Sequence, residues 1–175
     1  MVAATIVVCA LALTMASVDP PEVDPTAFHV RGADSLAREW LRIGAAESPT
    51  FRGLLARLVT SDVIVYITVV RRINGGSAGR LLFVAAMPPV RYLRIELAAG
   101  GSEREMVALA AHELQHAVEI AAAPGVRDSQ SLALLYLSMS ENKNRFRYDS
   151  AAARLIQERV RSELADCRDG LGMIE

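Results

Sequence analysis

The chain has 175 residues, of which 52% are hydrophobic and 22% charged, and its formal net charge is −1. This composition is typical of a globular protein and excludes a largely disordered chain, and the length suits one domain with a sizeable core. Lys and Arg (19) nearly balance Asp and Glu (20) and form no basic patch, so nucleic acid is not expected as a partner.

Residues 1–16 carry no charged side chain, are rich in Ala, Val and Leu, and end in small residues. This pattern is typical of an export signal that is cleaved after Ala16, which predicts a periplasmic or extracellular protein. The segment is short for a membrane span, so we expect membrane anchoring only if it stays uncleaved. Cys9 lies within it, and its removal leaves Cys167 without an internal disulfide partner.

Residues 17–32 are rich in Pro and Asp and predict an extended linker or wrapping arm, and residues 33–175 are then expected to form one domain. His29 lies in the arm. It is a conceivable metal ligand, but a single His in a loop without any surrounding pattern is more often solvated.

The domain begins with two predicted helices, one capped by Ser35 and running through Ile43, the other covering residues 51–58. Three strands are predicted next, at residues 62–70, 80–86 and 90–97. Their short connections, marked by Asn-Gly-Gly and Pro-Pro, suggest an antiparallel meander.

Three further helices are predicted after the strands. The first follows a capping box formed by Ser102 and Glu105 and ends at Pro124-Gly125. A short helix is expected at residues 129–137. The last runs from Asp149 or Ser150 to Ala165, and its predicted core positions are Leu155, Val160 and Leu164.

The helix after the strands contains His112-Glu113-Leu114-Gln115-His116, a His-Glu-x-x-His motif. Residues four apart lie one above the other on a helix, so both imidazoles can bind one tetrahedral Zn²⁺. Glu113 lies about 100° around the helix from His112, where it can reach a water without binding the metal. The motif predicts a zinc-dependent hydrolase in which Glu113 is the general base.

The rest of this helix supports the functional interpretation over an accidental pair of solvated His side chains. An apolar arc covers one side of the helix, and a polar cluster bordered by Met106, Leu109 and Ile120 lies opposite. This cluster consists of His112, Gln115, His116 and Glu119. We therefore expect the polar residues to face a cleft within the protein, where they must be paired or metal-bound.

Residues 112–118, His-Glu-Leu-Gln-His-Ala-Val, resemble the His-Glu-Leu-Thr-His-Ala-Val segment of the thermolysin-like zinc peptidases, the gluzincins. The whole chain also resembles a family of short, exported, uncharacterised bacterial proteins. Their shared features correspond to residues 62–66, 112–119 and 148–152, with Asp149 and Ser150 in place of that family's Glu and Thr. The resemblance implies an α+β, minimal zincin-like domain, in which a small antiparallel sheet packs against the motif helix and flanking helices.

The third zinc ligand is open from the sequence. The resemblance to gluzincins implies a carboxylate on a downstream helix and hence Asp149, although an Asp before a helix is equally expected to be its N-cap. Glu119 returns to the face of His112, but it lies about two turns away and more plausibly orients a ligand. Glu141, in a polar loop, is a further candidate, supported only by its negative charge.

Metallopeptidases often place a further donor near the developing oxyanion, and Tyr148, next to Asp149, is the candidate for this catalytic role. The expected function is therefore an exported zinc metallopeptidase acting on a peptide or protein. The alternative is a secreted or anchored domain that keeps a zincin fold but only binds another protein.

Overall fold

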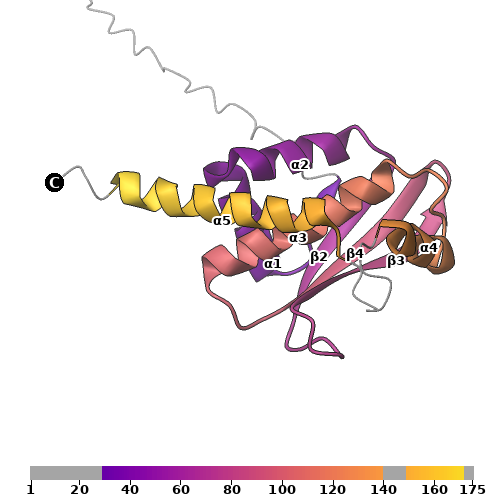
Figure 1. Ribbon diagram of the computed structural model, residues 1–175, viewed down its shortest axis with the longest axis horizontal. Coiled ribbons are helices and arrows are strands. Elements are labelled where there is room, and N and C mark those ends of the chain that lie inside the picture. The colour runs from indigo at the N-terminus through magenta and orange to yellow at the C-terminus, as the bar shows by residue number, and fades with distance from the viewer. Residues whose placement is uncertain (1–28, 140–148, 172–175) are drawn as a thin grey trace, which may run out of the picture.

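The computed structural model describes residues 29–139 and 149–171, which form an α+β fold (Figure 1). Its elements, in chain order, are β1 (Val30–Gly32), α1 (Ser35–Glu47), α2 (Pro49–Val59), β2 (Val63–Val70), β3 (Gly79–Met87), β4 (Val90–Ala98), α3 (Glu103–Ala121), α4 (Ser129–Met139) and α5 (Ala151–Leu171). The helices and strands predicted from the sequence are confirmed, with bounds that differ by a few residues. β1 was not predicted and occupies the end of the expected arm.

The four strands form one mixed sheet in the order β1-β2-β4-β3. β2 pairs in parallel with β1 and with β4, whereas β3 has β4 as its only partner among the described strands, in antiparallel register. The predicted antiparallel meander is therefore wrong, because β4 lies between β2 and β3. The physical reason is burial: β4 supplies the fully buried Leu93, Ile95 and Leu97, whereas β3 is largely part-exposed and carries a bulge, as edge strands often do.

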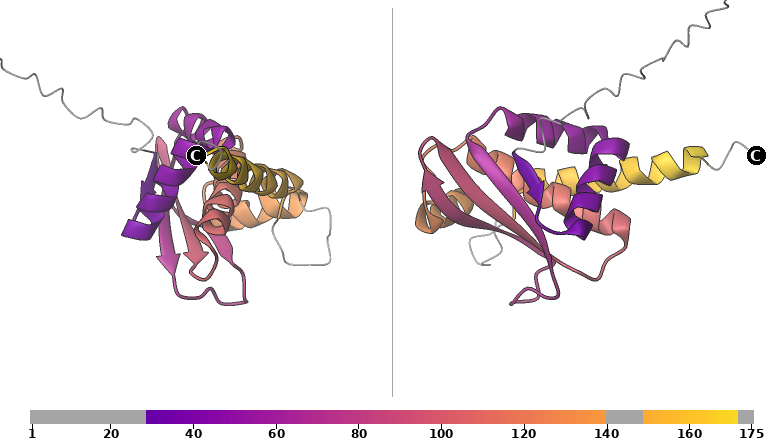
Figure 2. Two further views of the ribbon diagram at one scale, coloured as in Figure 1. Left: turned by 90° about the vertical axis from the view of Figure 1, so that its left-hand side faces the viewer. Right: turned by 180° about the vertical axis from the view of Figure 1, so that it is seen from behind.

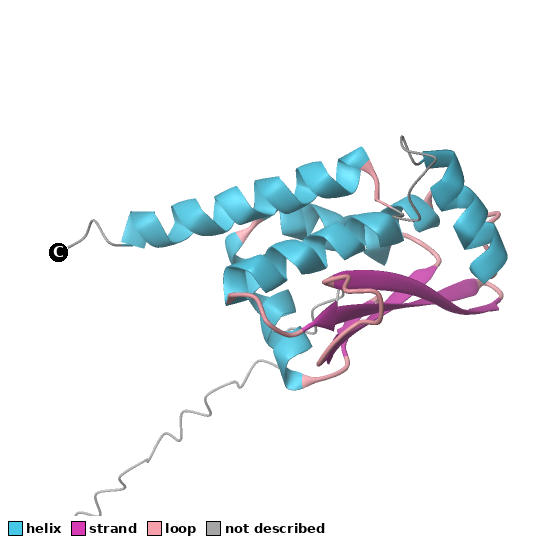
Figure 3. Cartoon of the chain, turned by 60° about the horizontal axis from the view of Figure 1, so that its bottom comes forward, coloured by secondary structure: helices cyan, strands magenta, loops and turns pink. Residues whose placement is uncertain are grey.

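Helices cover one face of the sheet, as Figure 3 shows. α3 packs on β3 and β4, and α5 lies along the outer side of α3. Seen from behind, the strands lie in front of α3 and α5, and no described helix crosses β2 or β4 on that face (Figure 2). The core between the layers is apolar and includes Leu114 and Ile120 of α3 together with strand residues such as Ile67 and Ile95.

The helix that carries the motif is fixed at both ends. Ser102 caps its N-terminus by accepting a hydrogen bond from the Glu105 N–H, but the carboxylate of Glu105 pairs with Arg161 on α5 instead of completing a capping box. At the other end, the fully buried Arg91 of β4 donates to the carbonyls of Ile120 and Ala123. The main-chain N–H groups of Ala123 and Val126 also donate to these carbonyls, so Arg91 adds a second, charged donor to each and stabilises the end of α3.

Asp62, just before β2, forms an ion pair with Arg91, with a 2.5 Å separation between Oδ1 and Nη2. Without this partner, burying the charged guanidinium would carry a large desolvation free energy. The pair therefore links the start of two neighbouring parallel strands to the end of the motif helix.

Two side-chain predictions for the helices are wrong. Asp34, not Ser35, caps α1, with its Oδ1 accepting from the Ala37 N–H at 2.9 Å. Leu155 is 60% exposed, because the buried side of α5 follows Ala153, Val160 and Leu164 at helical spacing.

None of the described helices is both long enough and apolar enough to cross a membrane.

Candidate metal centre

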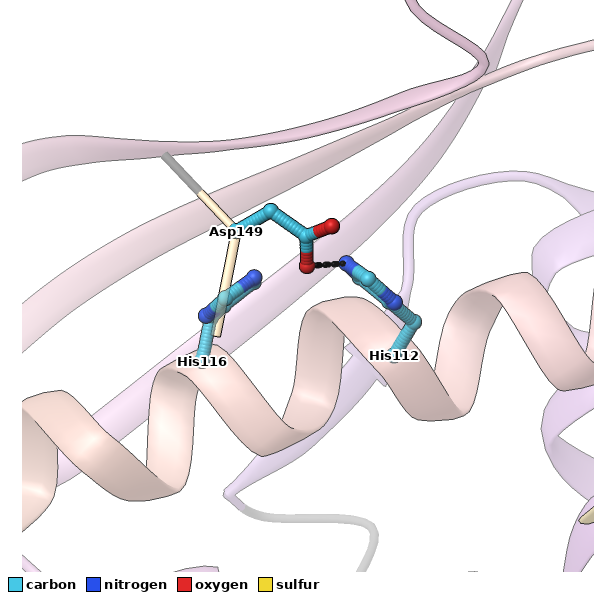
Figure 4. A group of neighbouring side chains, drawn as sticks. All are labelled: His112, His116 and Asp149. Carbon is cyan, nitrogen blue, oxygen red and sulfur yellow. Dashed lines mark ion pairs between the residues drawn. The ribbon is translucent and has the colours of Figure 1, made fainter. Parts of the chain in front are cut away.

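Three side chains predicted as zinc ligands converge at one point (Figure 4). His112 and His116 project from adjacent turns of α3, and Asp149 reaches them from the residue pair that leads into α5. One potential ligand atom from each lies within 4.8 Å of the other two. This convergence joins the motif helix to a residue that lies 33 positions after His116 in the chain.

Two of the candidate ligand atoms, His116 Nε2 and Asp149 Oδ1, are buried without a hydrogen-bond partner among the described residues. Nδ1 of His112 is also buried without such a partner, but the His112 nitrogen that faces Asp149 is Nε2 (Figure 4). His112 Nε2 lies 3.4 Å from Asp149 Oδ1. Buried polar atoms normally find partners, and two imidazoles with one carboxylate form a donor set that suits a divalent transition metal such as zinc. The residues present therefore fit the group that the motif predicts.

Asp149 is not the N-cap of α5. The Ser150 hydroxyl accepts the Ala153 N–H at 3.0 Å, and the Ser150 carbonyl accepts the Arg154 N–H. Capping is thus done by the next residue, which leaves Asp149 Oδ1 directed at the His pair. Its other oxygen, Oδ2, accepts from Arg154 at 3.1 Å.

The other residues considered as third ligands stand elsewhere. His29 contacts the Val63 carbonyl through Nδ1 at 3.1 Å, on the edge of the sheet, and is not in the cluster. Glu119 contacts Nδ1 of His116 at 2.8 Å, on the opposite side of the ring from the ligand atom Nε2. Glu141 and the predicted catalytic Tyr148 lie outside the described residues.

Glu113 lies beside this cluster and is only 5% exposed. Burial raises the pKa of its carboxyl to about 7, an effect that nearby His116 opposes. A carboxyl with this pKa can both accept and release a proton near neutral pH. Burial also lowers the pKa of His112, helped by the neighbouring His116, so its imidazole is held neutral, as metal binding requires.

The polypeptide at the start of β3 comes close to Glu113. A Cβ placed on Gly79 would lie 2.5 Å from Glu113 Oε1, well inside contact distance. Only Gly allows this approach. The turn before β3 contains Gly75 and Gly76, both with positive φ, which is the conformation that Gly tolerates best.

A cavity of about 590 Å³ opens between this turn and α3. Its walls come from residues 74–81 on one side and from His112, Glu113 and His116 on the other, with Asp149 also contributing. Of the polar side chains expected to face a cleft, His112 and His116 line this cavity, whereas Gln115 and Glu119 do not. The volume lies within the range of sites that bind small molecules or a few residues of a peptide.

Tyr136 of α4 is a cavity residue that the sequence does not single out. It is 6% exposed, and its ring meets that of His116 edge to face, with centroids 5.3 Å apart. Burial, with the negative charges of Glu113 and Glu119 nearby, raises the pKa of its phenol, which therefore stays protonated. In the sequence, Tyr136 stands in an unbroken apolar run without any spacing that links it to the motif, so no signal marks it.

Comparison of the chain with protein-family models, with curated proteins and with solved structures finds no match.

Proposed function

We propose that this protein is an exported zinc-dependent hydrolase with a zincin-like fold, and that it acts as a peptidase. The observation that supports this most is the convergence of His112, His116 and Asp149 beside a buried Glu113 in a cavity. Nε2 of His116 and Oδ1 of Asp149 have no hydrogen-bond partner among the described residues. Burying two imidazoles and a carboxyl costs free energy, and a helix with a purely structural role would gain nothing from this arrangement to offset that cost.

In this proposal, His112, His116 and Asp149 hold the zinc ion. When bound, zinc would polarise a carbonyl and lower the pKa of a water molecule. Glu113 would take up the proton of the attacking water and return it to the leaving amine. Tyr136 lines the cavity beside His116, so in this proposal it helps to position the bound substrate.

The position of β3 favours a peptide or protein as the substrate. This strand is at one end of the sheet order and its first residues line the cavity. An extended peptide can pair with the main chain of an edge strand and so place a peptide bond next to the cluster. Export is proposed from the uncharged apolar character of residues 1–16.

A second candidate function is the binding of another protein without catalysis. Large apolar side chains are exposed on two elements that contribute residues to the cavity wall, Val84 and Met87 on β3 and Leu134 and Leu137 on α4. Exposed apolar groups of this kind often mark a protein contact.

One comparison tests both candidates. Zinc content and hydrolysis of a quenched-fluorescence peptide library are measured for the wild type, for Glu113→Gln and for a control, Glu158→Gln, which alters an exposed carboxylate on α5. We expect one zinc per chain in all three and loss of hydrolysis in Glu113→Gln alone. Zinc without hydrolysis in the wild type would favour the binding protein, and a folded wild type that takes up no zinc would refute the metal site.

A further inference from the structure

Glu119 connects the two elements that carry the candidate ligands. One of its oxygens, Oε2, lies 2.8 Å from Nδ1 of His116 on its own helix. The other, Oε1, accepts a hydrogen bond of 2.6 Å from the Ser150 hydroxyl at the start of α5 and one of 3.3 Å from Gln115. A single carboxylate thus joins a His ligand on α3 to the residue that follows Asp149.

The direction of these hydrogen bonds is fixed by the donors available. The Ser150 oxygen accepts the Ala153 N–H, and its own proton is directed at Glu119. An ionised carboxylate is an acceptor only, so with Glu119 ionised the proton between its Oε2 and His116 lies on Nδ1. Burial alone would raise the pKa of Glu119, but the hydrogen bonds from His116, Ser150 and Gln115 lower it below its usual value.

This proton distribution determines which atom of His116 is free. A neutral imidazole that carries its proton on Nδ1 presents a lone pair on Nε2, and Nε2 is the buried atom without a partner. The hydrogen bond between Glu119 and Ser150 also affects Asp149, because Asp149 directly precedes Ser150 in the main chain that leads into α5. The position of the Asp149 carboxylate relative to the His pair therefore depends on the same contact.

We infer that Glu119 is a positioning residue that sets two metal ligands together: it fixes the tautomer of His116 and, through Ser150, holds Asp149 in register with α3. This inference rests on one part of the proposed function, the binding of zinc. Glu119 holds the ligands in place before the metal binds. Loss of its hydrogen bond to His116 or to Ser150 should therefore weaken metal binding without removing a ligand.

The first test uses Glu119→Leu, which keeps the approximate side-chain volume but accepts no hydrogen bond. Zinc affinity is measured by competition with a chelator, and the tautomer of His116 is read from its ring ¹⁵N shifts in the metal-free protein. We expect zinc affinity to fall about 10-fold to 100-fold, as for other partners of metal-binding His residues, and the proton of His116 to move to Nε2.

The second test concerns Ser150 and does not depend on the first variant folding. Ser150→Ala removes the hydroxyl, and Ser150→Thr restores it. Ser102→Ala is the matched control, since it removes the N-cap hydroxyl of α3 at a distance from any ligand. Zinc affinity should fall in Ser150→Ala, return in Ser150→Thr and stay unchanged in Ser102→Ala.

Several outcomes would overturn the inference: wild-type zinc affinity in Glu119→Leu or Ser150→Ala, an unchanged His116 tautomer in Glu119→Leu, or complete loss of zinc in Glu119→Leu with retention in Asp149→Ala, which would make Glu119 itself the ligand. If the wild type binds no zinc, the proposed function fails, and the tautomer measurement alone still decides whether Glu119 positions His116.

Discussion

The position of the Glu113 carboxyl depends on its helix and also on the absence of a side chain at Gly79. Gly79 has no side chain at the point where β3 passes Glu113, and a Cβ there would lie 2.5 Å from Oε1. The carboxyl would have to move away from the position in which it lines the cavity.

Gly79→Ala should therefore reduce peptide hydrolysis while zinc content stays the same. A displacement of about 1 Å in a catalytic group costs on the order of 100-fold in rate, which is the size of the expected loss in kcat. Gly53→Ala is the control, because a Cβ at Gly53 meets nothing within 4 Å. Equal activity of Gly79→Ala and the wild type would contradict the role of this close approach.

Single residues of the site differ in how far they could be predicted. His112, Glu113 and His116 follow from spacing alone, since helix geometry places residues four apart together. Asp149 needed a resemblance, because a contact between residues 116 and 149 depends on how α5 packs on α3. Tyr136 could not be predicted, since only the packing of α4 brings its ring to His116.

At the scale of elements, the end of α3 depends on a buried ion pair. The guanidinium of Arg91 donates to helix carbonyls and is neutralised by Asp62. The hydrogen bonds and charge of Arg91 lower the pKa of Asp62 below its usual value of 3.8. The ion pair therefore stabilises the fold at every pH at which Asp62 is ionised.

Asp62→Asn should lower the free energy of unfolding by about 3 kcal/mol at neutral pH, since a buried charge loses its partner. The folded pKa of Asp62 is below the unfolded value, so this contribution is complete above pH 3.8 and is lost as the pH falls through the folded pKa. Urea unfolding of the metal-free protein at several pH values measures it.

Two comparisons make that experiment decisive. The difference between wild type and Asp62→Asn should shrink as the pH falls below 3.8, whereas Glu39→Gln, in an exposed ion pair on α1, should leave stability nearly unchanged. A difference that stays constant with pH would show that Asp62 acts by packing and not by charge.

A second carboxylate, Glu163 of α5, holds the start of α2. It accepts hydrogen bonds from the Ser48 hydroxyl, from the Thr50 hydroxyl at 2.6 Å and from the Thr50 N–H at 3.1 Å. Glu163→Ala should cost about 1–3 kcal/mol of unfolding free energy, because these donors lose a charged acceptor. Glu158→Ala, at an exposed position of the same helix, should have little effect, and an equal loss in both would argue against the contact.

For the whole molecule, local patterns predicted most elements but not their order in the sheet. Alternating apolar residues and β-branched residues mark β2, β3 and β4 in the sequence. The order of these strands in the sheet depends instead on which strands can be buried beneath the helices. The largely apolar run of β2, interrupted by Thr68, fits a strand with parallel neighbours, and the exposed Arg80, Val84 and Met87 of β3 fit an edge. The three residues of β1 are too few for any periodic pattern.

The molecule as a whole is arranged so that α3 and α5 meet at the candidate metal centre, with the sheet beneath α3 (Figure 3). A metal bound by residues from both segments would therefore tie the last helix to the core. Because such a ligand binds only the folded state, zinc should raise the unfolding free energy, by about 2.7 kcal/mol at a concentration 100 times its Kd.

The most direct measurement is zinc binding by the wild type and by Asp149→Ala, followed by chelator competition and by thermal unfolding, with Asp166→Ala as a control at an exposed position of α5. We predict one zinc per chain in the wild type and the control, a clear rise of Tm with zinc, and a large loss of both affinity and stabilisation in Asp149→Ala. Equal zinc affinity in Asp149→Ala and the wild type would contradict the three-residue metal centre.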